Sequence, residues 1–286
     1  MNAKKAAAEE QDAPTPAVAR EDSRYRKMVK YAFLKNWKPG AEVVDVTKSD
    51  LLEAAAEGKF ADTVNPGDAI YDARGRSGLA ADVKAKAPMG KVWVILGTGD
   101  GKYQFVAVDP ALVNIKPAVG KERIKIPDST PEIISRYALS DEQALLARIR
   151  YNRLLDIFLG ITCYSLQNHL RTNIESWGQI EVDELYVGVN ATGATFVMPV
   201  EAKAGSERIS IVQAFQGFEL ARLRYPELVA RPVAATFVDG QDTIALFEFA
   251  PGKPIPTVRN ERHYRLVPAS EITADDLRTY REASGK

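Results

Sequence analysis

The chain has 286 residues, of which 45% are hydrophobic, 27% charged and 8% aromatic. These shares lie near the averages for soluble globular proteins, so they exclude a chain that is disordered throughout, and the length fits one large domain or two modest ones. Lys and Arg together number 38, as do Asp and Glu. The summed charge therefore offers no long-range attraction for nucleic acid, and a polyanion site would have to come from a local patch.

Three features bear on where the chain works. No run of about 18 apolar residues occurs, so we expect no membrane-spanning helix and no membrane partner. Residues 1–22 contain acids, prolines and alanines but no apolar segment, which predicts a flexible tail rather than an export signal. The single cysteine, Cys163, cannot form an intrachain disulfide. This cysteine usage fits a cytoplasmic location.

The first part of the chain reads as a small module. In chain order, the patterns predict a helix at 25–37, a strand at 41–47, a helix at 50–60, and turns around one short strand at 65–78. The clearest pattern lies at 91–110, where two runs of β-branched and aromatic residues flank a glycine-rich turn, as in a β-hairpin. We expect a β-rich amino-terminal module over 23–128 that recognises DNA or a partner.

A second part begins where three cap-forming side chains precede Pro131, which suits the first position of a helix. This places a domain over 129–286. The remaining patterns predict helices at 140–160 and 162–177, strands at 179–189 and 194–205, a helix at 207–228, and strands at 231–240, 242–250 and 261–268.

Carboxylates and a lysine gather on two neighbouring predicted strands. Residues two apart along a strand point to one side, so Glu201 and Lys203 project together. On the preceding strand Glu181 and Asp183 also share a face, and the intervening turn folds that strand beside Glu201. Such oxygen ligands suit Mg²⁺ or Mn²⁺, and the lysine can hold an anionic oxygen or a nucleophilic water. A phosphodiester is the natural substrate. Glu181 is either a third ligand or a surface acid, and we favour the surface.

The same residues resemble a known family. Asp183, then Glu201-Ala202-Lys203 on the following strand, then a helix that bears Gln213, resemble the PD-(D/E)XK nuclease superfamily. The element order over about 162–239 is similar to the αβββαβ core of that superfamily, and the wider stretch looks like a group of bacterial endonuclease-like proteins. The resemblance implies an α/β, restriction-endonuclease-like fold with a mixed sheet, and an Mg²⁺-dependent endonuclease that cuts DNA.

The resemblance also implies roles for individual residues. Asp183 and Glu201 bind the metal, the carbonyl of Ala202 completes the site, Lys203 orients the attacking water, and Gln213 is a supporting polar residue. Cleavage of both DNA strands would need two active sites, which favours a homodimer without establishing one. The rival hypothesis is a nuclease fold that has lost activity and serves as a DNA-binding or assembly scaffold. The presence of all three of Asp, Glu and Lys argues against it.

Three further observations bear on this hypothesis. A second Glu-x-Lys, at 57–59, ends a predicted helix, where residues two apart do not share a face, and we reject it. The first core strand of the superfamily has no obvious counterpart, because Arg171 to Gly178 leaves little room for one. Pro199 lies inside the strand that bears Glu201, and proline is disfavoured in central strands.

Arginines near these acids are candidates for contact with DNA phosphates. Arg171 and Arg208 come just before and just after the predicted acidic strands, so they are the first choice. The alternative set on the preceding helix is Arg148, Arg150 and Arg153. We do not expect His169 or His263 to be catalytic, because the sequence shows no serine or cysteine paired with either one.

Overall fold

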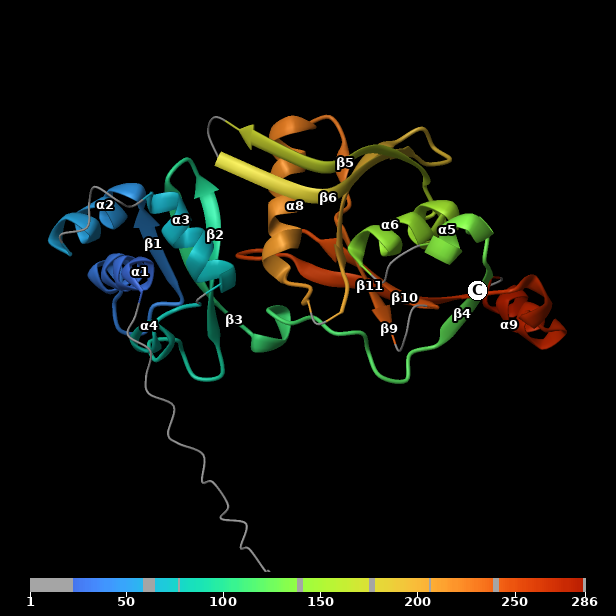
Figure 1. Ribbon diagram of the computed structural model, residues 1–286, viewed down its shortest axis with the longest axis horizontal. Coiled ribbons are helices and arrows are strands. Elements are labelled where there is room, and N and C mark those ends of the chain that lie inside the picture. Colours follow the sequence, from blue (N-terminus) through green and yellow to red (C-terminus); the bar gives the residue numbers. More distant parts are fainter. Residues whose placement is uncertain are drawn as a thin grey trace, which may run out of the picture.

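The computed structural model describes residues 23–58, 65–76, 78–137, 141–174, 178–205, 207–238 and 242–284. The predicted tail at 1–22 lies outside these residues. They form an amino-terminal module around a three-stranded sheet and a larger part around an eight-stranded sheet (Figure 1). Within the described residues, no helix has both the length and the apolar character needed to cross a membrane.

Helices cover one face of the three-stranded sheet in the amino-terminal module. Its elements are α1 (Arg24–Asn36), β1 (Val43–Thr47), α2 (Lys48–Glu57), α3 (Pro66–Tyr71), the π-helical η2 (Asp72–Arg76), α4 (Ala81–Lys84), β2 (Val92–Gly99) and β3 (Lys102–Val108). The strands pair antiparallel in the order β1-β3-β2. Phe33 of α1 packs against Trp93 and Phe105, with ring centroids 5.3 and 5.0 Å apart, at the centre of one buried core.

The strand predicted within 65–78 is wrong, because this segment is the helix α3 continued by η2. Asn65 and Pro66 form a helix start: the Asn65 side chain accepts a hydrogen bond from the N–H of Gly67, and proline suits the first turn. The helices at the start of the module and the hairpin of β2 and β3 agree with prediction. The module is therefore a mixed α/β unit rather than a β-rich one.

The larger part is a mixed sheet with strand order β4-β11-β10-β9-β7-β6-β5, plus β8 beside β7. Its elements are η3 (Pro110–Leu112), β4 (Arg123–Pro127), α5 (Glu132–Tyr137), α6 (Glu142–Tyr151), α7 (Leu154–Leu159), β5 (Thr162–Ile174), β6 (Gly178–Val189), β7 (Thr195–Lys203), α8 (Ile211–Arg224), β8 (Val229–Ala230), β9 (Val233–Val238), β10 (Thr243–Ala250), β11 (Thr257–Val267), η4 (Ala269–Glu271) and α9 (Ala274–Ser284). The pairs β7–β9, β7–β8 and β11–β4 are parallel, and the others are antiparallel. The chain is thus α/β with a mixed sheet.

The helix predicted at 162–177 is wrong, because β5 occupies this segment. β5 pairs antiparallel with β6 from Thr162 opposite Val189 to Ile174 opposite Gly178. The helical stripe in the sequence does not mark a buried face, since Leu166 is 52% exposed while Leu170 is buried. Pairing with β6 therefore overrides the local pattern. This strand is also the one that the sequence prediction lacked before β6.

The single helix predicted at 140–160 is two helices. α6 ends at Tyr151, and Arg153 takes the left-handed conformation, with φ of 50°, before α7 begins. Between them the buried side chain of Asn152 accepts a hydrogen bond from the N–H of Ser129 and donates one to the hydroxyl of Thr130. Asn152, between α6 and α7, therefore holds the segment around Ser129 and Thr130 that precedes α5.

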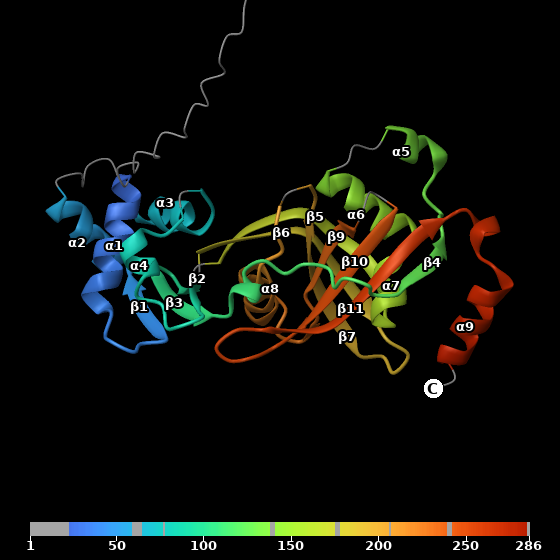
Figure 2. The same ribbon diagram turned by 90° about the horizontal axis from the view of Figure 1, so that it is seen from below.

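Helices cover both faces of the large sheet (Figures 1 and 2). α6 and α7 bury their apolar side chains, such as Leu145 and Leu155, against Met198 and Val200 of the sheet. α8 covers the opposite face, where Leu220 packs with its neighbours on β6 and β7. β7 is therefore buried on both sides, which explains its nearly continuous apolar sequence.

Pro199 is tolerated in β7 because the parallel neighbour of this strand changes at that point. β8 pairs with Phe196 and Val197, and β9 pairs with β7 from Val200 onward. Pro199 lies between the two, opposite Leu185 of β6. A residue without an N–H therefore interrupts no parallel ladder.

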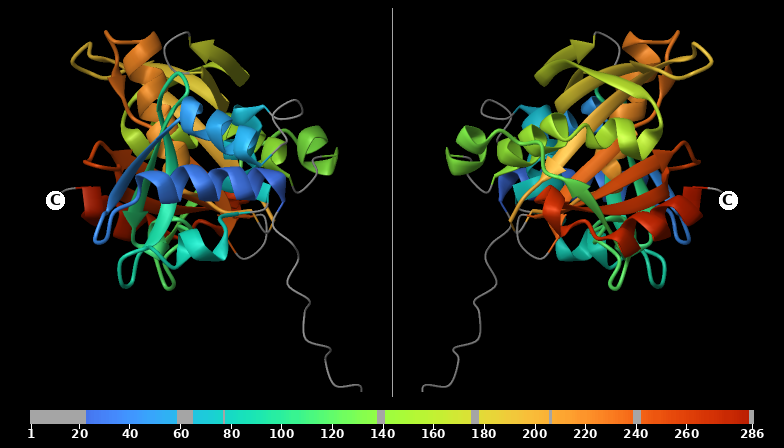
Figure 3. Two further views of the ribbon diagram at one scale, coloured as in Figure 1. Left: turned by 90° about the vertical axis from the view of Figure 1, so that its left-hand side faces the viewer. Right: turned by 90° about the vertical axis from the view of Figure 1, so that its right-hand side faces the viewer.

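The two parts of the molecule share a hydrophobic core. Leu96 of β2 and Val106 of β3 lie in one buried cluster with Ile211 of α8 and Phe247 of β10. The uncovered face of the small sheet therefore packs on the larger part. β4, which falls within the 23–128 range, pairs with β11 of the large sheet. Figure 3 views the molecule along its long axis, with the module in front of the larger part on the left and behind it on the right.

Candidate active site

The site lies where β6 and β7 separate. Their pairing ends at Glu184 opposite Val200; beyond it β6 continues with β5, and β7 continues with β9. Asp183 is the next residue on β6, and its Oδ2 accepts a hydrogen bond of 2.8 Å from the N–H of Ala202. The N–H and C=O of one strand residue face the same neighbour, so the Ala202 carbonyl also lies on the Asp183 side. We call this point the strand fork.

Lys203 forms the centre of a cluster of acids at the strand fork. Its Nζ lies 2.9 Å from Glu201 Oε1, 3.0 Å from Glu142 Oε1, and 3.8 Å from both Asp183 Oδ2 and Glu207 Oε2. The Lys203 side chain is only 11% exposed. The structure thus brings together Asp183, Glu201 and Lys203, as the strand pattern predicts.

Gln213 fixes the carboxylate of Glu201 from the first turn of α8. Its Nε2 donates a hydrogen bond to Glu201 Oε1, and its Oε1 accepts one of 3.0 Å from the N–H of Ser210. Ser210 is the N-cap of α8, and its hydroxyl accepts from the helix in return. This capping box uses both ends of the Gln213 amide. The helix start and the acidic strand are therefore held together.

Burial raises the pKa values of both acids, and the Asp183 carboxylate raises that of Glu201 further. Burial, and then the neighbouring Asp183 carboxylate, raise the pKa of Glu201 to about 7, although Lys203 opposes the shift. Burial also raises the pKa of Asp183, against the hydrogen bond from Ala202. Burial alone would lower the pKa of Lys203, but Glu201 and the other acids raise it above its ordinary value. Lys203 therefore stays protonated and charged, whereas Asp183 and Glu201 take up a proton more readily than free carboxylates do.

The structure adds site residues that sequence reasoning missed. Glu142 comes from the first turn of α6, and it lines a cavity of about 380 Å³ with Glu207 and His169. Asp141 beside it is the N-cap of α6. In the sequence these residues indicate the start of a helix, and nothing in the pattern links Glu142 to Lys203. His169 is one of two non-glycine residues in the described part of the chain that have a positive φ, here 47°. Such backbone conformations are uncommon and gather at functional sites.

The predicted arginines lie in different settings. Arg171 makes a two-oxygen ion pair with Glu181, and both side chains are about half exposed or more, so Glu181 is the surface acid that we favoured. Arg208 is exposed and has no ion pair within the described residues. In the alternative set, Arg150 binds the buried Glu184 at 2.9 Å and Arg153 pairs with Asp156.

Cys163 and His263 are both buried. Burial raises the pKa of the Cys163 thiol to about 12, which leaves it unreactive. His263 is 2% exposed, and its Nε2 lies 2.7 Å from Glu261.

The donor set at the strand fork fits a magnesium ion. Mg²⁺ in proteins binds through one or two carboxylates and keeps several waters. Asp183 and Glu201 supply two carboxylates whose raised pKa values a cation would lower again, and the Ala202 carbonyl adds a third oxygen on the same side. In the ranges that the structure describes, no three His, Cys, Asp or Glu side chains are grouped to hold a metal. An ion here would thus depend on the two carboxylates, the carbonyl and solvent.

Comparison of the chain with models of known protein families gives no match, and comparison with curated proteins gives none either.

Proposed function

We propose that this protein is a metal-dependent endonuclease that hydrolyses phosphodiester bonds in DNA, built on a restriction-endonuclease-like core. The observation that carries the proposal is the strand fork, where Asp183, Glu201 and Lys203 meet beside the first turn of α8. The strand order β5-β6-β7, followed by α8 and the parallel strand β9, supports it. These are the elements that the PD-(D/E)XK resemblance implies.

Each side chain has a distinct task in this proposal. Lys203 keeps its proton and presents Nζ to hold an attacking water or a phosphate oxygen. Glu201 and Asp183, with the Ala202 carbonyl, would hold Mg²⁺ or Mn²⁺. When bound, that ion supplies positive charge against the charge that develops on the phosphate oxygens. Gln213 keeps one Glu201 oxygen in a fixed direction, so that the carboxylate does not rotate away from the site.

In this proposal, exposed arginines beside the strand fork contact the DNA backbone. Arg208 lies between the acidic strand and α8, and its exposed side chain is available to a phosphate. Arg171 would have to exchange its ion pair with Glu181 for a phosphate contact. Such contacts position DNA without reading its sequence. Cutting of both strands would need two such sites, and a homodimer therefore stays a prediction.

Cleavage assays test this function. Pure protein is incubated with supercoiled plasmid and with single-stranded DNA, in Mg²⁺, in Mn²⁺ and in chelator. We expect cleavage in metal and none in chelator, loss of cleavage in Glu201→Gln, and retention in Glu181→Gln, which makes the same substitution at an exposed glutamate. Absence of cleavage under every condition would favour the inactive scaffold instead.

A further inference from the structure

The amino-terminal module has the topology of a DNA-binding unit. Its main elements run α1, β1, α2, α3, β2, β3, and its strands pair antiparallel in the order β1-β3-β2. This is the arrangement of a winged helix-turn-helix, in which the second helix of the helix-turn-helix lies in the major groove and the hairpin flanks it. Here α2 and α3 are the helix pair, joined by a longer connection than the usual turn. α4 is a short addition before β2.

α3 has one buried and one exposed face. Ala69 and Ile70 of α3 and Ala73 of η2 are buried in the module's core, whereas Asp68 and Tyr71 lie three residues apart on the exposed face of α3. Arg74 of η2 is held against the sheet, because its Nε donates a hydrogen bond of 3.0 Å to the Ile95 carbonyl of β2. Tyr71 is 65% exposed, a large fraction for an aromatic side chain. Asp68 is of a residue type that reads base edges, since aspartate accepts from the amino group of cytosine.

Free lysines lie at the turn between β2 and β3. Lys102 opens β3 opposite Thr47, and the N–H of Lys48 donates a hydrogen bond of 2.6 Å to the Gly101 carbonyl in this turn. Both lysine side chains are exposed, and neither has an ion pair among the residues that the structure describes. The turn therefore presents two ammonium groups beside a small glycine backbone, which suits contact with DNA phosphates.

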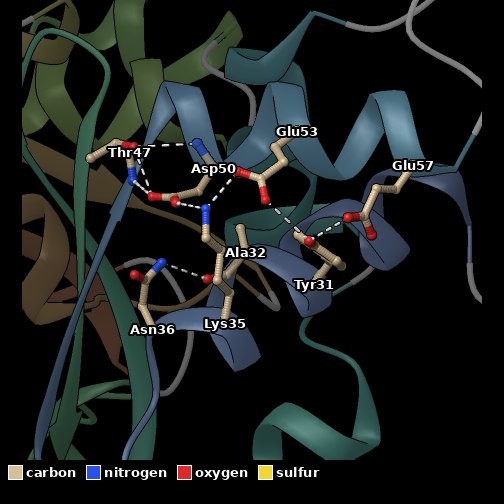
Figure 4. Close-up of polar contacts among 8 residues, drawn as sticks. All are labelled: Tyr31, Ala32, Lys35, Asn36, Thr47, Asp50, Glu53 and Glu57. Atoms are coloured by element: carbon tan, nitrogen blue, oxygen red, sulfur yellow. Dashed lines mark hydrogen bonds and ion pairs between the residues drawn. The ribbon is translucent and has the colours of Figure 1, made fainter.

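Lys35 of α1 serves a different purpose, because with Tyr31 it holds α1 and α2 together (Figure 4). Lys35 is engaged by Asp50 and Glu53, and the hydroxyl of Tyr31 donates to Glu53 and Glu57. Thr47 and Asp50 complete a capping box at the start of α2. This network fixes the first helix of the pair rigidly on the module.

Charge favours DNA as the partner. Residues 23–108 contain 14 Lys and Arg against 10 Asp and Glu, in a chain whose total charge is zero. Apart from Tyr71, the exposed face of α3 carries polar or charged groups, whereas the centre of a protein interface is apolar and poor in charge. We propose that the module docks on double-stranded DNA, with the exposed face of α3 in the major groove and the Lys48–Lys102 turn on the adjacent backbone.

Binding is measured on the full chain carrying Glu201→Gln, so that cleavage does not interfere. The probes are a labelled 25-base-pair duplex in a salt series and a random duplex library from which bound sequences are selected. Lys48→Glu with Lys102→Glu should lower the slope of log affinity against log salt by about two units. Tyr71→Ala should weaken duplex binding about tenfold, and Asp68→Ala should change the base preferred at one selected position.

Matched controls separate docking from general charge. Lys84→Glu makes the same charge change as Lys102→Glu alone, but on α4, toward the opposite end of the small sheet (Figure 1), and should leave the salt slope unchanged. Tyr137→Ala removes an equally exposed tyrosine from α5 and should leave affinity unchanged. Tyr71→Phe keeps the ring and the fold if Tyr71→Ala proves unstable, and it should still weaken binding because the hydroxyl is lost.

The outcome is independent of the proposed cleavage. If every α3 and turn variant binds like its control, the docking proposal is overturned and DNA contact belongs to the larger part alone. Failure to bind any duplex, with capture of a protein instead, would also overturn it. A chain that binds through α3 but cuts no DNA supports this inference and defeats only the nuclease function.

Discussion

The carboxylate of Asp183 accepts a hydrogen bond of 2.8 Å from the N–H of Ala202, at the point where their two strands have stopped pairing. The side chain thus takes the place of a missing strand partner and satisfies a backbone group that would otherwise lack one. Because Ala202 lies between Glu201 and Lys203, this bond also fixes both of its neighbours relative to Asp183. A single contact therefore sets the geometry of the candidate site.

Removal of Lys203 should affect both cleavage and stability. In Lys203→Ala, Glu201 and Asp183 lose the cation between them, so we expect the free energy of unfolding to fall by about 1–3 kcal/mol and cleavage to fall at least about a hundredfold. Denaturant unfolding and plasmid cleavage measure the two effects. The double variant Lys203→Ala, Glu201→Gln should recover stability but not activity. Undiminished cleavage by Lys203→Ala would remove the lysine from the mechanism.

Stability should fall as pH rises in the absence of metal. Glu201 has a pKa of about 7 in the folded protein against an ordinary glutamate value of 4.5, so the folded state binds the proton more tightly. The free energy of unfolding should therefore decrease between pH 4.5 and 7, on the order of 2–3 kcal/mol from this group. Urea unfolding at pH 5 and pH 8 in chelator measures the change. Glu201→Gln should flatten it, and an equally steep profile in that variant would disprove the assignment.

Metal should stabilise the folded protein. A divalent ion that binds Asp183 and Glu201 only in the folded state raises the free energy of unfolding, by about 2.7 kcal/mol at a hundred times its Kd. Thermal unfolding with and without Mg²⁺ or Mn²⁺ should show the increase in the wild-type protein. Asp183→Asn should lose it, whereas Glu227→Gln, which removes an acid outside the strand fork, should keep it. Equal metal effects in all three proteins would place the ion elsewhere.

Gln213 and Ser210 provide a matched pair of variants. Both belong to the capping box of α8, so Ser210→Ala and Gln213→Ala should each lower the free energy of unfolding by about 1 kcal/mol. Only Gln213 contacts Glu201. We therefore expect cleavage to drop in Gln213→Ala and to persist in Ser210→Ala. If the two variants lose activity in parallel, Gln213 acts through helix stability alone.

The arginines beside the fork should control the salt dependence of DNA binding. In the nuclease-inactive Asp183→Asn protein, Arg208→Ala should lower the log–log salt slope by about one unit for every sequence alike. Arg171→Ala should change it less, because Glu181 already neutralises that side chain. Fluorescence titrations at several salt concentrations give the slopes. No change in either variant would move the contact to Arg148, Arg150 and Arg153.

The sequence by itself determined those features that depend on neighbouring residues. Glu201 and Lys203 share a face because side chains alternate along any strand, and the hairpin at the end of the module follows from its glycine turn. The sequence predicts the helix α8 as well, but it places the start at 207, whereas Ser210 is the cap and the helix begins at Ile211.

Only the tertiary structure decided what depends on residues distant in the chain. The segment 162–177 fits a helical stripe as well as a strand, and pairing with β6 selected the strand. Glu142 lies 61 positions from Lys203 and reaches it only because α6 packs across the end of β7. Local spacing carries no information about such contacts, because the free energy that forms them comes from burial of surfaces brought together by the whole fold.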